Sequence, residues 1–344
     1  MTLQTQDPAQ IAAAKGLPEP AQWRAVTAEY PFRLTAHLAN LIDPALGAAD
    51  PIYRQFMPDA AELAVDSGDI DPLAEESQML APRLIRRFRD RAVVLVTARC
   101  AAHCRFCFRK RLWRADGELA DITDAELTAV LATIRSTPEI SEILISGGDP
   151  LSLPNERLQE ILAEFSALTQ ITTIRLATRM PVAAPQRFSP ETLDMLAEFD
   201  KLWVLTHFNH PHELSEESRN CCRALIKRGI PVLNQTVLLK DVNDSPEILE
   251  RLFRALVAIK VKPHYLFHLD PVQGARHFAT GIESGLAALR YFRSRLSSLA
   301  VPAFAIDLPE GGGKVSLQPD YCENGAYWDI YDRKLITYPD KERR

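Results

Sequence analysis

Three cysteines that stand close together are the residues of this sequence most suited to chemistry. Cys100, Cys104 and Cys107 have C-x3-C-x2-C spacing and follow a strongly apolar run, so they lie on the loop that leaves a buried strand. Iron–sulfur clusters are held by thiolates, and three protein ligands leave one iron open for chemistry. The spacing therefore predicts a [4Fe–4S] cluster. The alternatives are a structural zinc site completed by His103 or Cys322, or three unrelated thiols.

A glycine turn, Ser146-Gly147-Gly148-Asp149, follows the next apolar run. Glycine has no side chain, so backbone amides exposed at such a turn can approach a ligand closely. An ordinary tight turn between a strand and a helix is the alternative. Its position beside the cysteine loop favours a ligand-binding edge.

A lysine follows three glycines in the stretch 311–314. The stretch is not a phosphate-binding loop, because Leu308 replaces the first glycine and Val315 replaces the Ser or Thr of that motif. Lys314 is suited to form a Schiff base with an aldehyde such as pyridoxal 5′-phosphate (PLP). A solvated loop lysine is the alternative.

Charged residues surround these motifs. Asp270 and Asp307 each end an apolar run, and a pair of carboxylates in one pocket suits an ammonium group. Arginines precede the first strand and follow the cysteines, which favours a cofactor phosphate and a substrate carboxylate as ligands. Helix caps or surface salt bridges would explain the acids equally well, and a solvated face would explain the arginines.

Composition narrows the class of protein. The chain has 344 residues, of which 47% are hydrophobic and 25% are charged, and its formal net charge of −5 argues against nucleic acid as the main partner. No apolar run approaches the roughly 20 residues that span a membrane, and no secretory signal opens the chain. The six cysteines do not form a disulfide framework, so we expect a cytoplasmic protein without a membrane partner.

Short β-branched runs alternate with amphipathic stretches after about residue 80, which predicts an α/β fold with a parallel sheet. Six such units predict a partial (β/α)6 TIM-like barrel, with its site at the carboxyl ends of the strands. We expect a helical N-terminal extension over 1–80, the barrel over 81–300 and a C-terminal segment with the lysine over 301–344. The expected strands are 92–97, 142–146, 172–178, 202–206, 231–238 and 264–269, with a seventh apolar run at 303–307.

The motifs together resemble the PLP-dependent radical S-adenosylmethionine (SAM) aminomutases of the lysine 2,3-aminomutase type, over about residues 84–338. The stretches that carry the resemblance are Cys100–Cys107, Ser146–Pro150, His207–Pro211, Asn234–Leu239, Asp270 with His277-Phe278, and Gly311–Lys314. The resemblance implies an isomerase that converts L-lysine to β-lysine with a [4Fe–4S] cluster, SAM and PLP. It also implies an electron donor such as flavodoxin or ferredoxin, and it is compatible with a homo-oligomer.

The same resemblance implies a role for each matching residue. Lys314 corresponds to the catalytic lysine that forms the internal aldimine with PLP. The other PLP contacts are Arg87, Arg91 and His207. The SAM contacts are Ser146, Gly147, Gly148, Asp149 and Gln235. The substrate contacts are Arg109 for the α-carboxylate, and Asp270 and Asp307 for the ε-ammonium group of lysine.

Some features depart from the family pattern. Ser245 stands where zinc-binding members carry a cysteine, and no cysteine follows Cys322, so we predict no structural zinc. Several stretches are similar to the shorter EpmB-type enzymes, which make (R)-β-lysine for elongation factor P. Another amino acid, such as glutamate, is the alternative substrate, although a third carboxylate beside Asp270 and Asp307 would be repelled.

Overall fold

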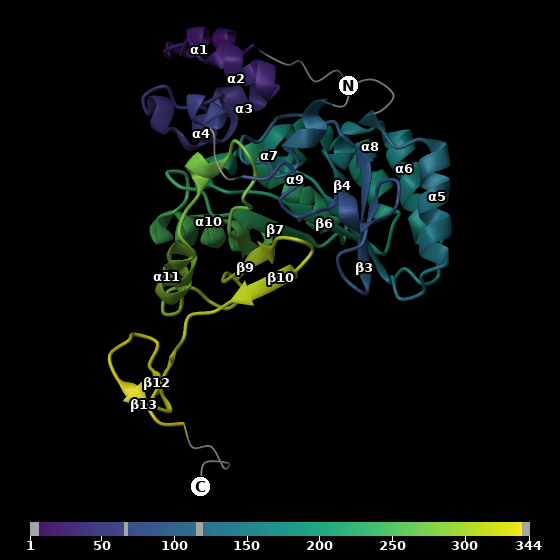
Figure 1. The fold of residues 1–344 in the computed structure, drawn as a ribbon. Coiled ribbons are helices and arrows are strands. Elements are labelled where there is room, and N and C mark those ends of the chain that lie inside the picture. Colours follow the sequence, from purple (N-terminus) through teal and green to yellow (C-terminus); the bar gives the residue numbers. More distant parts are fainter. Residues whose placement is uncertain (1–6, 65–67, 115–119, 339–344) are drawn as a thin grey trace.

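The computed structural model describes residues 7–64, 68–114 and 120–338, and its main feature is one sheet of ten strands (Figure 1). Strands that are neighbours in the sheet are also neighbours in the sequence. Strands β3 to β9 pair in parallel, whereas β1, β2 and β10 make the antiparallel pairs at the two edges. The strands are β1 (Met79–Ala81), β2 (Leu84–Ile85), β3 (Arg91–Thr97), β4 (Glu142–Gly147), β5 (Thr173–Ala177), β6 (Leu202–Thr206), β7 (Val232–Val237), β8 (Lys262–Phe267), β9 (Ala303–Leu308) and β10 (Gly313–Leu317).

Helices follow the parallel strands and cover the outer face of the sheet (Figure 1). The capping signals of the sequence operate locally: Thr123 accepts a hydrogen bond from the backbone N–H of Glu126, and Gly229 follows helix α9 (Glu216–Lys227) with a positive φ of 82°. The helices of eight or more residues each bury one apolar stripe, as an amphipathic pattern requires. The helices are α5 (Asp124–Arg135), α6 (Asn155–Ser166), α7 (Met180–Ala183), α8 (Pro190–Ala197), α9 (Glu216–Lys227), α10 (Pro246–Ala258) and α11 (Ile282–Phe292).

The sheet is an open barrel, because the order of its strands begins at β1 and ends at β10 without pairing these two edges. The prediction of an α/β partial barrel is therefore confirmed, and each of the six expected strands overlaps an observed one. The seventh apolar run forms a further parallel strand, β9, beside β8. Parallel order brings the carboxyl ends of all these strands to one edge, where the expected motifs lie.

Lys314 is not the solvated loop lysine of the alternative interpretation. The residue lies in β10, which returns antiparallel to β9, and it is paired in register with Asp307. A turn at Gly311 and Gly312 joins the two strands. The side chain of Lys314 is therefore positioned by a strand pair and not by a mobile glycine run.

Two smaller parts flank the barrel (Figure 1). The N-terminal part carries α1 (Pro8–Lys15), α2 (Trp23–Glu29), α3 (Ala36–Leu41) and α4 (Pro51–Phe56), which gather at one side of the barrel. A separate sheet of β11 (Cys322–Glu323), β12 (Ala326–Trp328) and β13 (Leu335–Ile336) extends away from it. Within the described ranges, no helix has the length and apolar character needed to cross a membrane.

Candidate active site

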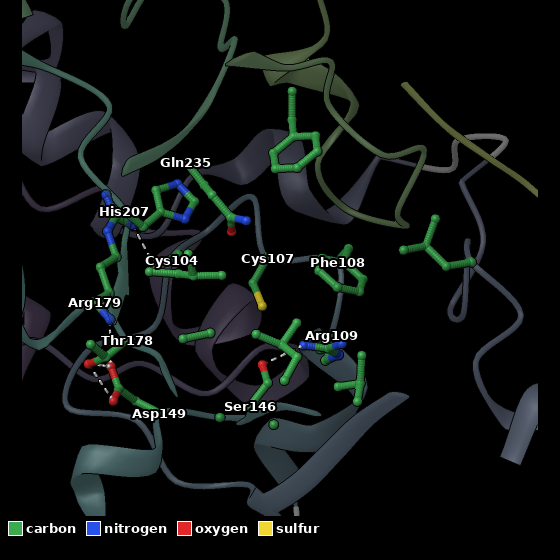
Figure 2. A pocket seen from close by; sticks show the side chains of 18 of the residues that line it. Cys104, Cys107, Phe108, Arg109, Ser146, Asp149, Thr178, Arg179, His207 and Gln235 are labelled. Carbon is green, nitrogen blue, oxygen red and sulfur yellow. Dashed lines mark hydrogen bonds between the residues drawn. The ribbon is translucent and has the colours of Figure 1, made fainter. Parts of the chain in front are cut away.

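One cavity of about 520 Å³ lies against strands β3 to β10 and contains the residues that the sequence singled out. Parallel strands bring residues that are far apart in the sequence to one space. The predicted residues that line the cavity are Arg87, Arg91, Cys100, Cys104, Cys107, Arg109, Ser146, Gly147, Gly148, Asp149, His207, Gln235, Asp270, Asp307 and Lys314. Figure 2 shows a group of them from close by.

The three cysteines on the loop after β3 are free thiols. Burial raises the pKa of Cys107 to about 11, and the neighbouring Cys104 contributes to the rise. Burial likewise raises the pKa of Cys100. Thiolates in such a place need a nearby cation. The iron of a cluster supplies that cation, so three thiols on one cavity wall fit a [4Fe–4S] cluster.

The residues that would complete a zinc site are placed differently. His103 Nδ1 lies 2.7 Å from the carbonyl oxygen of Pro31, and its ring stacks on Trp113 with 4.5 Å between the centroids. Cys322 is exposed in the separate sheet. Among the residues that the structure describes, no three His, Cys, Asp or Glu side chains are arranged to share one metal ion. In a cluster each thiolate binds its own iron, so the sulfurs need not converge on one point.

The glycine turn after β4 packs directly against the cysteine loop. The N–H of Gly148 donates to the carbonyl oxygen of Thr97 at 2.6 Å, and the N–H of Asp149 donates to that of Arg99 at 2.7 Å. A Cβ added to Gly147 or Gly148 would lie 2.2 Å from these same oxygens. The expectation that these amides face a ligand is therefore wrong for Gly148 and Asp149, because the amides connect two loops.

Asp149 also directs its carboxylate into the protein. Its oxygens accept hydrogen bonds from the hydroxyl of Thr178 at 2.8 and 3.0 Å and from the N–H of Arg179 at 2.7 Å (Figure 2). Burial raises the pKa of Asp149 to about 6, while these hydrogen bonds oppose the rise. The carboxylate therefore connects the carboxyl ends of β4 and β5.

Lys314, Asp307 and Arg87 form one ionic group in the cavity. Lys314 Nζ lies 3.1 Å from Asp307 Oδ2, and Arg87 Nη1 lies 3.3 Å from Asp307 Oδ1. Burial lowers the pKa of Lys314, and Asp307 limits the fall. A lowered pKa favours the neutral amine that can attack an aldehyde. The Nζ atom also lies 3.9 Å from the centre of the Phe267 ring.

Arg87 has the chemistry of an anion site. Its Nε and Nη2 atoms are buried and have no hydrogen-bond partner among the described residues. Unpaired buried donors of a guanidinium fit the oxygens of a phosphate. Arg91, the second arginine expected to bind phosphate, begins β3 and lies over the ring of Phe88 at 3.8 Å. It is therefore about 20 Å along the strand from the cysteine end.

Asp270 carries a carboxyl group whose charge is unfavourable in this cavity. Burial and the nearby Asp307 raise the pKa of Asp270 to about 7, although Lys314, Arg87 and Arg109 favour the charged form. A bound cation would lower this pKa and stabilise the carboxylate. The two acids thus provide a place for a ligand ammonium group.

Arg109 is fixed by a partner that the sequence did not reveal. Its Nε and Nη2 atoms donate to the carboxylate of Glu75 at distances from 2.6 to 3.1 Å, and Nη1 donates to Ser146 Oγ at 3.1 Å (Figure 2 shows the Ser146 contact). Arg111 also donates to Glu75, at 2.8 Å. Burial alone would raise the pKa of Glu75, but Arg109 and Arg111 outweigh it and hold the pKa at about 2.

A second buried acid, Glu62, contacts the cysteine loop. It accepts hydrogen bonds from Arg105 at 2.7 to 3.0 Å and from Lys110 Nζ at 3.0 Å, and the side chains of Glu62 and Arg105 are both fully buried. Neither Glu62 nor Glu75 belongs to a motif, and their contacts span more than thirty residues. Periodicity and spacing carry no signal for such pairs.

His207 and Gln235 complete the wall beside the cysteines (Figure 2). His207 Nε2 lies 3.0 Å from Asn209 Oδ1, and its ring tilts against Phe106 with 5.7 Å between the centroids. Burial lowers the pKa of His207 well below its usual range, and Arg179 lowers it further. The imidazole is therefore neutral, so one of its ring nitrogens donates a hydrogen bond and the other accepts one.

The sequence of this chain is similar to those of known proteins. Residues 94–252 match the Radical SAM superfamily. The chain is 43% identical to an Aquifex aeolicus protein provisionally named L-lysine 2,3-aminomutase, over 90% of this chain and 84% of that protein. It is 37% identical to L-lysine 2,3-aminomutase of Clostridium subterminale, over 89% of this chain and 74% of the relative. It is also 35% identical to glutamate 2,3-aminomutase of Clostridioides difficile, over 86% of this chain and 69% of the relative. This chain therefore belongs to the radical SAM superfamily and, within it, to the lysine 2,3-aminomutase family.

Proposed function

We propose that this enzyme converts L-lysine to β-lysine by moving the amino group from C2 to C3. The chain is a radical SAM isomerase of a family that uses a [4Fe–4S] cluster, SAM and PLP. When bound, the cluster and SAM supply a 5′-deoxyadenosyl radical, and PLP supplies the carbonyl group that carries the migrating nitrogen. The residues of the chain must bind both ends of the amino acid and exclude water.

The observation that carries the choice of lysine is the pair of carboxylates on one cavity wall. Asp307 raises the pKa of Asp270, so the two acids lie within electrostatic reach of each other. The ammonium group of lysine would relieve their repulsion, whereas the side-chain carboxylate of glutamate would add to it. Because both substrates occur among the relatives, this pair is what favours lysine.

The ion pair of Lys314 with Asp307 supports the same assignment. The amine of Lys314 cannot serve both as the partner of Asp307 and as the nucleophile for the cofactor aldehyde. Arg87 stays beside Asp307, and the ε-ammonium group of the substrate would replace the cation that Lys314 no longer supplies to the two acids. The unpaired donors of Arg87 support a phosphate contact, which we extend to Arg91.

The other end of the substrate would meet Arg109. Glu75 fixes the guanidinium through Nε and Nη2, so Nη1 remains on the side of Ser146 and the cavity. An α-carboxylate fits this position as a charge-assisted partner. Ser146, Gly147, Gly148, Asp149 and Gln235 would line the SAM position and His207 would contact PLP.

We further infer a cytoplasmic enzyme that receives its electron from a small donor such as a flavodoxin or ferredoxin. All six cysteines are free thiols, and an oxygen-sensitive cluster requires reducing surroundings.

One experiment tests the substrate. Reconstituted protein is incubated without oxygen with SAM, a strong reductant and either L-lysine or L-glutamate, and the products are separated. We expect β-lysine, and kcat/KM for lysine should fall about a hundredfold in Asp270→Ala and Asp307→Ala, as loss of a charged contact of about 2.7 kcal/mol implies. The control is Asp194→Ala, which removes an exposed carboxylate. Unchanged lysine turnover in both variants would exclude the two acids as the site of the ammonium group, and faster turnover of glutamate than of lysine would exclude lysine as the preferred substrate.

A further inference from the structure

Arg179 contacts a cysteine of the loop directly. It follows β5, and its Nη1 atom donates to Cys104 Sγ at 2.6 Å (Figure 2). The backbone N–H of Arg179 bonds to Asp149, which fixes where the side chain leaves the main chain. A guanidinium therefore faces one of the three sulfurs.

Other residues hold this guanidinium in place. Its Nη2 atom donates to Gln55 Oε1 and to Glu213 Oε1, each at 2.7 Å. Glu213 is fully buried and also accepts the backbone N–H of His210 at 3.2 Å. These acceptors lie on Nη2, so the N–H of Nη1 remains directed at the sulfur.

Aromatic rings restrict the guanidinium further. Its central carbon lies 4.6 Å from the centre of the Phe56 ring and 5.2 Å from that of Phe106. Only about a tenth of the side chain is exposed. Water therefore screens the charge of Arg179 weakly at this distance from Cys104.

We propose that Arg179 sets the reduction potential of the cluster through its hydrogen bond and its charge at Cys104. The proposal rests on the assignment of the three cysteines as cluster ligands. A cluster becomes more negative when it accepts an electron, and hydrogen bonds to its sulfurs together with nearby charge set its potential. An N–H donor with a positive charge stabilises the reduced state more than the oxidised state. Arg179 acts through Cys104 and is therefore a positioning and tuning residue.

The test is a redox titration in which the electron paramagnetic resonance signal of the reduced cluster is measured at each potential. Reconstituted protein is titrated without SAM, so that contacts to SAM do not enter. At a fixed applied potential, Arg179→Gln should lower the ratio of reduced to oxidised cluster about tenfold, which is about 59 mV for a one-electron couple. Iron and sulfide content are measured in each variant.

The matched control is Arg175→Gln. Arg175 lies on β5, four residues before Arg179, and lines the same cavity, but its side chain pairs with Glu142. This variant loses the same charge without losing a bond to a cysteine, so the ratio should stay within about twofold of wild type. An equal fall in both variants would show a general effect of charge and overturn the specific role of Arg179.

A second variant covers the case in which Arg179→Gln does not retain iron. Arg179→Lys keeps the charge, but an ammonium group cannot reach Glu213, Gln55 and Cys104 in the fork geometry of a guanidinium. We expect a smaller fall, about threefold in the ratio. An unchanged ratio in a variant of full iron content overturns the proposal. Wild-type protein that holds a reducible cluster but leaves lysine unchanged would contradict the proposed function alone.

Discussion

The cavity disfavours the charged form of Asp270 until a substrate cation binds beside it. Its pKa is raised to about 7, first by burial and then by Asp307. In the unfolded chain an aspartate has a pKa of about 3.9. Between these two values the unfolded state has lost the proton that the folded state still binds, so stability falls as the pH rises from about 4 to 7. Above both pKa values the loss of folding stability is complete.

Asp270→Asn should remove this dependence, because the amide resembles the protonated acid and cannot ionise. Without added lysine, the variant should have a melting temperature close to wild type near pH 4. Its advantage should grow up to about pH 7 and then level off, since the wild-type carboxylate is ionised above its folded pKa. Thermal unfolding of both proteins across this range provides the measurement. A difference that does not change with pH would contradict the assignment of the shift to Asp270.

Glu75 should matter for substrate affinity, because it fixes Arg109. Glu75→Gln keeps the shape of the side chain but removes the charge that orients the guanidinium. We expect KM for lysine to rise about tenfold with a smaller change in kcat, as for a contact made equally in the ground and transition states. Glu76→Gln is the neighbouring control, because that side chain is 73% exposed. Equal KM values for the two variants would show that Glu75 does not affect substrate binding.

The hairpin of β9 and β10 is the element that decides where Lys314 points. Its register pairs Lys314 with Asp307 and Gly313 with Leu308. Successive side chains of a strand point to opposite faces, so a slip of one residue would turn Lys314 away from the cavity. Gly311 in the connecting turn has a φ of 76°, which glycine adopts readily and asparagine tolerates.

Deletion of Gly312 should therefore impair cofactor binding without preventing folding. The shortened turn favours a shifted register. We expect the absorption band of bound PLP to fall about tenfold or more, while the circular dichroism spectrum stays unchanged. Gly311→Asn keeps the length of the turn and should retain the band. Full PLP binding by the deletion variant would show that the register does not position the lysine.

The elements of the barrel could be predicted because their signals are local. Apolar runs, helix caps and motif spacing lie within a few residues of one another, and the six expected strands are present. The parallel order then explains why Asp270 and Asp307 share a cavity, and the antiparallel return of β10 brings Lys314 to it. The contacts of Glu75 and Arg179 could not be predicted, because they join segments with no common pattern.

At the scale of the whole molecule, the N-terminal part completes the site and does not only cover it. Glu62 pairs with Arg105 and Lys110, and the carbonyl oxygen of Pro31 accepts a hydrogen bond from Arg105 at 3.1 Å. The N–H of His103 donates to the carbonyl oxygen of Arg33 at 2.9 Å. Segments before the barrel thus fix the conformation of the cysteine loop.

This dependence predicts that a buried residue outside the barrel controls cluster retention. Glu62→Gln would leave Arg105 and Lys110 buried beside a neutral group, and breaking a buried ion pair costs about 3–5 kcal/mol. We expect a lower melting temperature and less iron per chain after reconstitution. Asp241→Asn breaks the exposed pair with Arg54, which also joins the N-terminal part to the barrel, and should change stability by less than about 1 kcal/mol. If both variants retain iron equally, the ion pairs of Glu62 are not what holds the cysteine loop in the conformation that binds the cluster.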